Sequence, residues 1–61
     1  MALPQTEAEA RAYCRRFATS DLPDIAKALW DRVDASKNID AVAWMSFLAA
    51  VVESEFRRRS N

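Results

Sequence analysis

The sequence predicts an all-α fold, a small three-helix bundle formed by one domain that spans residues 1–61. Apolar residues recur at helical spacing in three segments, and each segment starts at a residue type that commonly caps helices. Glycine is absent, which disfavours the tight hairpin turns and phosphate-binding loops that use positive φ angles. We therefore predict helices over about residues 6–18, 21–35 and 40–58.

The first helix is predicted from Thr6 and Glu9, whose spacing is that of a capping box. Residues on one side of the helical wheel are apolar, and arginines occupy the rest, as in an amphipathic surface helix. The apolar side consists of Ala10, Tyr13, Cys14, Phe17 and Ala18.

The second helix is predicted to begin at Ser20 or Asp21 as N-cap, with Pro23 in its first turn. Asp24 there would complement the positive end of the helix dipole. Its apolar stripe consists of Leu22, Ile25, Ala26, Leu29 and Val33.

The third helix is predicted to follow Asn38, which we expect to close the second helix in a left-handed conformation. Asp40 is the expected N-cap, and Ile39 and Trp44 have the spacing of a hydrophobic staple. Arginines at 57–59 complement the negative end of this helix.

Residues 41–52 form an unusually apolar run, interrupted only by Ser46. The run lies between Asp40 and Glu53 and is shorter than the roughly 20 residues that a membrane-spanning helix needs. On a helical wheel the apolar arc of the third helix covers about 220°, against a stripe of about 100° on an ordinary surface helix. This helix therefore needs neighbours on two sides.

Two arrangements would satisfy that requirement. In the first, the other two helices cover the third helix on both sides within a monomeric bundle. In the second, part of the arc stays open and docks on a second copy of the chain or on another protein. The first helix offers few large apolar groups, so we favour the second arrangement, with contact residues Trp44, Met45, Leu48, Val52 and Phe56.

The predicted function is accordingly that of a non-enzymatic protein–protein interaction module, a small regulatory, inhibitory or accessory protein. Its predicted partner is a second copy of the chain, in a homodimer, or another protein. The alternative is a small nucleic-acid-binding regulator, because a three-helix domain is also the frame of helix-turn-helix proteins. The zero net charge of the chain and its apolar third helix argue against this alternative. The candidate nucleic-acid contacts are Arg11, Arg15, Arg16, Arg57, Arg58 and Arg59.

Residues for catalysis, cofactor binding or metal binding are not predicted. Histidine is absent and Cys14 is the single cysteine, so neither a disulfide within the chain nor an ordinary zinc site is expected. We expect no small-molecule substrate and no membrane partner. The N-terminus has no secretory pattern, which predicts a cytoplasmic protein, and the excess of alanine and arginine is typical of a bacterial or phage source.

Overall fold

A computed structural model describes residues 4–60 and confirms the all-α three-helix fold. A short 3₁₀ turn, η1, precedes the second helix. The elements in chain order are α1 (Glu7–Cys14), η1 (Thr19–Asp21), α2 (Leu22–Ala35) and α3 (Ile39–Ser60).

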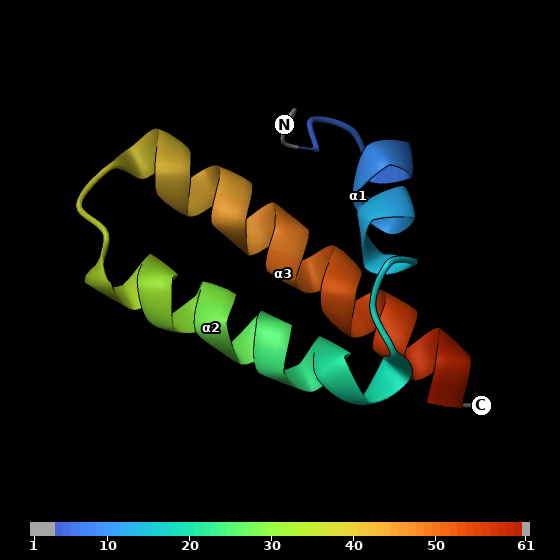
Figure 1. Ribbon diagram of the computed structural model, residues 1–61. Helices are drawn as coiled ribbons and strands as arrows, with labels where there is room; N and C mark the ends of the chain where they lie inside the picture. The colour runs from blue at the N-terminus through green and yellow to red at the C-terminus, as the bar shows by residue number, and fades with distance from the viewer. Residues whose placement is uncertain (1–3, 61) are drawn as a thin grey trace.

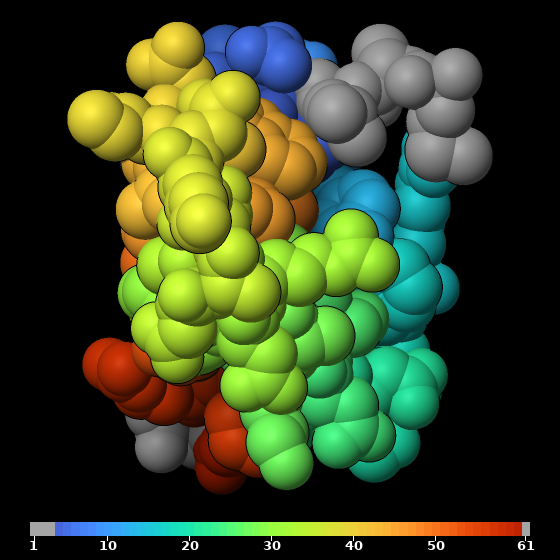
Figure 2. All heavy atoms as spheres, turned by 90° about the vertical axis from the view of Figure 1, so that its left-hand side faces the viewer, coloured from blue at the N-terminus to red at the C-terminus, as the bar shows by residue number. Residues whose placement is uncertain are grey.

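The two longer helices form an antiparallel hairpin, and the short α1 packs across the C-terminal half of α3 (Figure 1). The α2–α3 connection forms the end of the molecule that faces the viewer in Figure 2. The chain measures 35 × 21 × 18 Å along its principal axes. Because α1 has 8 residues and α3 has 22, α1 leaves a large part of α3 uncovered.

Thr6 caps α1 as predicted, but the reciprocal half of the capping box differs, because Glu9 accepts from the Thr6 hydroxyl group and not from its backbone N–H. The Thr6 hydroxyl oxygen accepts the backbone N–H of Glu9 at 3.2 Å, and its hydroxyl group donates to the Glu9 carboxylate at 3.3 Å. The helix ends at Cys14, four residues before the predicted end. Two tight turns follow instead, which place the Phe17 ring edge-on to Tyr13 with centroids 5.2 Å apart. The carbonyls of Cys14 and Phe17 in this segment accept hydrogen bonds from the Arg59 side chain of α3.

The predicted start of α3 is wrong in its details. Asn38 has no positive φ; its side-chain oxygen accepts the backbone N–H of Ala41 at 3.1 Å. This bond gives Asn38 the capping role predicted for Asp40. Ile39 is 83% exposed, so it does not form the predicted staple with Trp44. Pro23 does lie in the first turn of α2, as predicted.

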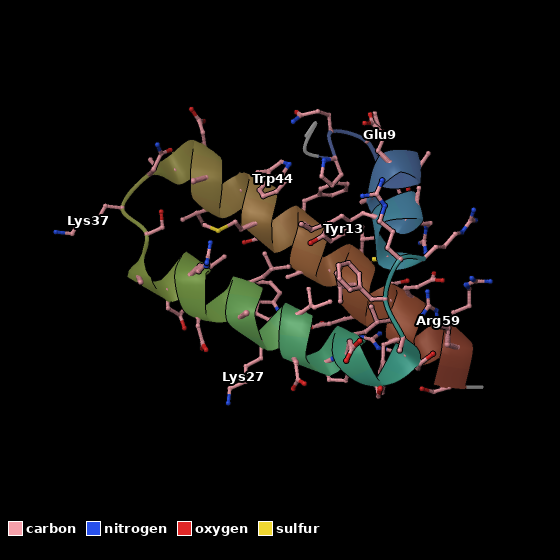
Figure 3. All side chains as sticks on the ribbon, viewed as in Figure 1. Glu9, Tyr13, Lys27, Lys37, Trp44 and Arg59 are labelled. Atoms are coloured by element: carbon pink, nitrogen blue, oxygen red, sulfur yellow. The ribbon has the colours of Figure 1, made fainter. Side chains whose placement is uncertain are left out.

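Buried side chains from all three helices meet along one side of α3. Trp44 packs against this core and donates its indole N–H to the Pro4 carbonyl at 2.7 Å, which ties the segment before α1 to α3 (Figure 3). No helix among residues 4–60 combines the length and the hydropathy needed to cross a membrane. The core cluster is Ala10, Cys14, Leu22, Ala26, Leu48, Val51 and Val52.

Replacing Val52 should test how much the chain depends on this core. Val52 is fully buried, and Val52→Ala removes two methyl groups and leaves a cavity. We expect the free energy of unfolding to fall by roughly 2 kcal/mol, measured by urea denaturation followed by circular dichroism. Val42→Ala, at a half-buried position of the same helix, is the matched control and should cost less than half as much. Equal losses would contradict the central position of Val52.

Candidate functional site

The five predicted contact residues on α3 differ in exposure. Leu48 and Val52 are 3% and 0% exposed and lie in the core of the chain itself. Trp44 and Phe56 are partly buried against that core, and Met45 is half-buried. In the folded single chain, Leu48 and Val52 are therefore closed to a partner. The predicted contact itself stays a prediction.

The open apolar surface of α3 lies on a different arc of the helix. Ile39 is 83% exposed and Phe47 is 36% exposed, and Ala43 and Ala50 are also exposed. The helical wheel shows that the apolar arc is too wide for one neighbour, but it does not show which part the neighbours cover. The covered part depends on where α1 and α2 pack. The sequence alone therefore did not identify Ile39 and Phe47 as exposed residues.

A groove of about 520 Å³ runs between residues 22–31 of α2 and residues 53–57 of α3. Its apolar lining includes Leu22, Ala26 and Phe56. Trp30 lines the same groove, and its indole N–H donates to the Glu53 carboxylate at 2.6 Å across the two helices. This hydrogen bond joins α2 to α3 at one wall of the groove.

Charged side chains of both signs border the groove. Lys27 and Asp31 come from α2, and Glu53 and Arg57 come from α3. Figure 3 shows Lys27 extending away from α2 into solvent. Glu53 also pairs with Arg57 at 3.9 Å. Apolar lining with charges of both signs at the edge is the general composition of a protein interface, with its apolar centre and polar rim.

The six predicted nucleic-acid contacts do not share one pocket. Arg11, Arg15 and Arg58 line a second pocket of about 520 Å³, together with Ser54 and Glu55. Arg57 instead lines the apolar groove.

Arg59 and Arg16 complete the set. Arg59 turns towards α1, where its guanidinium donates to the carbonyls of Phe17 at 2.9 Å and Cys14 at 3.1 Å. Arg16 is exposed.

Glu55 is the buried charge at the centre of the second pocket, with 2% of its surface exposed. Arg58 donates to both of its oxygens, at 2.7 and 3.2 Å, while Arg11 and Arg59 each donate at 3.4 Å. The hydrogen bonds from Arg58 are the main cause that lowers the pKa of Glu55 from 4.5 to about 2, with Arg59 acting in the same direction against the effect of burial. Glu55 therefore carries its charge throughout the neutral range.

Cys14 does not have the environment of a reactive thiol. It is fully buried, and burial, followed by the nearby Glu55 charge, raises its pKa. The thiolate is the nucleophilic form of cysteine, so this environment favours a packing role. Among residues 4–60, no group of three histidine, cysteine, aspartate or glutamate side chains is placed to hold a metal ion.

Comparison of the chain with protein-family models, with curated proteins and with solved structures finds no match.

The Glu55 cluster predicts a specific dependence of stability on pH. Its pKa in the folded chain, about 2, lies below the ordinary value of 4.5, so its contribution is complete above pH 4.5 and is lost as the pH falls towards 2. Glu55→Gln should flatten the fall of the urea midpoint over this interval relative to the wild-type chain. Asp34→Asn removes an exposed carboxylate and is the control. Parallel curves for wild type and Glu55→Gln would contradict the cluster.

Proposed function

We propose that this protein is a non-enzymatic protein–protein interaction module, a small regulatory, inhibitory or accessory protein that docks through α3 and the α2–α3 groove. The observation that supports this proposal most directly is the groove itself, with its apolar lining and its border of opposite charges, next to the uncovered apolar face of α3. An apolar side chain of the partner occupies the groove, and the border charges orient it.

The energetics of such a contact are favourable because the groove is already formed. Burying one side chain of the size of isoleucine or phenylalanine contributes about 1.5–3 kcal/mol. The Trp30 indole is held by Glu53 before binding, so little side-chain entropy is lost at this wall of the groove. Phe56, one of the five predicted contact residues, supplies part of the lining.

The partner we propose is a second copy of the chain. Each copy carries a groove and also an exposed anchor, Ile39, and the zero net charge of the chain imposes no general repulsion between copies. Ile39 and Arg57 are 18 residues apart, about five helical turns, so the anchor and one edge of the groove share a face of α3.

An antiparallel pair of α3 helices places the start of one helix beside the end of the other. This brings Ile39 of each copy towards the groove of the other, as a two-fold symmetric contact requires. Asp40 of one copy then faces the arginine-rich last turn of the other, and the opposite charges favour this direction of pairing. Ala43 and Ala50 between these ends are small, which permits close approach of the two helices.

Nucleic-acid binding through all six arginines has less support. The guanidinium of Arg59 is engaged with Glu55 and with two backbone carbonyls. Arg57 lines a different pocket from Arg11, Arg15 and Arg58. Few arginines therefore remain on any one surface to contact the phosphates of a nucleic acid.

Light scattering over a range of concentrations should test the proposed contact. We expect the wild-type mass to rise from 6.9 kDa towards twice that value. Ile39→Asp places a charge on the anchor at a helix start, where aspartate is favourable, and should weaken self-association by roughly tenfold or more, about the loss of 1.4 kcal/mol. Trp30→Ala, which removes one wall of the groove, should also weaken it.

Ile39→Val is the matched control, because it keeps the anchor apolar and should leave the association close to that of wild type. A wild-type chain that stays at 6.9 kDa at every concentration would exclude the second copy as partner. In that case, capture of host proteins by wild type but not by Trp30→Ala would retain the groove as an interaction site.

A further inference from the structure

We propose that the pocket lined by Arg11, Arg15, Ser54, Glu55 and Arg58 binds a phosphate group. The pocket has a volume of about 520 Å³ and lies between α1 and the last turns of α3. It is separate from the α2–α3 groove, with which it shares no lining residue. The site therefore goes beyond the protein contact proposed above and is independent of it.

Positive charge exceeds negative charge around this pocket. The guanidiniums of Arg11, Arg58 and Arg59 surround the Glu55 carboxylate, and Arg15 adds another guanidinium to the lining. Glu7, paired with Arg11 at 3.0 Å, is the second carboxylate of the group. Four positive and two negative side chains leave an excess of two positive charges, which matches the charge of about −1.5 to −2 on a phosphate monoester at pH 7.

The guanidiniums beside the pocket are held in place before a ligand arrives. Arg58 donates from Nε and Nη2 to the two oxygens of Glu55. Arg11 donates from Nε and Nη2 to Glu7 and from Nη1 to Glu55. Fixed guanidiniums lose little conformational entropy when an anion binds, which favours binding over that to freely rotating arginines.

Several donors stay free for a ligand. Arg15 is exposed and has no ion pair with any of residues 4–60, and Nη1 of Arg58 makes no hydrogen bond to them. Ser54 also lines the pocket. Guanidinium and hydroxyl groups are common donors to phosphate oxygens. A tetrahedral phosphate can accept from three directions at once, whereas a carboxylate has two oxygens in one plane.

The Glu55 carboxylate does not prevent this binding. Its two oxygens already accept four hydrogen bonds from three arginines, and the side chain is 2% exposed. Glu55 therefore acts as the internal anchor for the arginines, and their remaining N–H groups are the part of the cluster open to an incoming anion.

Titration with inorganic phosphate, followed by ¹H–¹⁵N NMR at pH 7 and constant ionic strength, tests the proposal. We expect saturable shifts of the Arg15 and Arg58 side-chain N–H signals and of the Ser54 amide. Arg15→Ala should weaken phosphate binding by roughly tenfold, because charged hydrogen bonds contribute about that factor or more. Arg15→Lys keeps the charge but loses the forked geometry, and should give an intermediate affinity.

Arg32→Ala is the matched control, since Arg32 is an exposed arginine on α2 outside the pocket. It should change phosphate affinity by less than about twofold, because a charge outside the pocket is largely screened by salt. Its net-charge change equals that of Arg15→Ala, so the comparison isolates the local contact. Shifts that never saturate, or equal affinities for Arg15→Ala and Arg32→Ala, would overturn the assignment. Acetate that binds as tightly as phosphate would overturn it as well.

Phosphoserine and adenosine monophosphate distinguish the sources of the phosphate group. Tighter binding of phosphoserine than of inorganic phosphate supports the site and identifies a phosphorylated protein as the source. Tighter binding of the nucleotide supports the site with a nucleotide as the source. In both cases the additional affinity should disappear in Arg15→Ala and persist in Arg32→Ala.

Discussion

The ion pairs of Glu55 join the short α1 to the last turns of α3. A buried carboxylate needs charged or hydrogen-bonding partners, because removing it from water is costly unless its charge is compensated. Glu55 meets this need with guanidiniums from α1 and from the last turn of α3. Arg59 then extends the network to the carbonyls of Cys14 and Phe17, where α1 ends. One buried negative charge thus links α1 to the end of α3, in addition to the core contacts of Ala10 and Cys14.

This dependence explains why so short a helix has a defined place. An isolated helix of 8 residues is unstable in water, and α1 contributes only two buried side chains, Ala10 and Cys14, to the core. The capping bond of Thr6 stabilises its first turn, and the Arg11–Glu55 pair and the Arg59 contacts attach it to α3. Because α1 is short, it covers only one side of α3, and this leaves the outer arc with Ile39 and Phe47 open.

The sequence predicted the helices well but not the sites that they form. Local signals such as the Thr6 cap and Pro23 in the first turn of α2 depend on neighbouring residues, and the structure confirms both. The carbonyls at the early end of α1 bond to Arg59, which is more than 40 residues away in the sequence, so no local signal records this contact. The pairs Trp30–Glu53 and Arg11–Glu55 join residues 23 and 44 positions apart. Such pairs become visible only when the helices have been placed.

The last turns of α3 serve both candidate sites because of the helical period. Glu53 and Glu55 are two residues apart, which turns their side chains by about 200° to nearly opposite sides of the helix. Glu53 therefore fixes Trp30 and pairs with Arg57 at the groove, whereas Glu55 gathers Arg58 and Arg59 at the second pocket. Alternating acids followed by consecutive arginines thus give each side of one helix an acid and its guanidinium partners. A chain of 61 residues can in this way form two chemically different surfaces around a single helix.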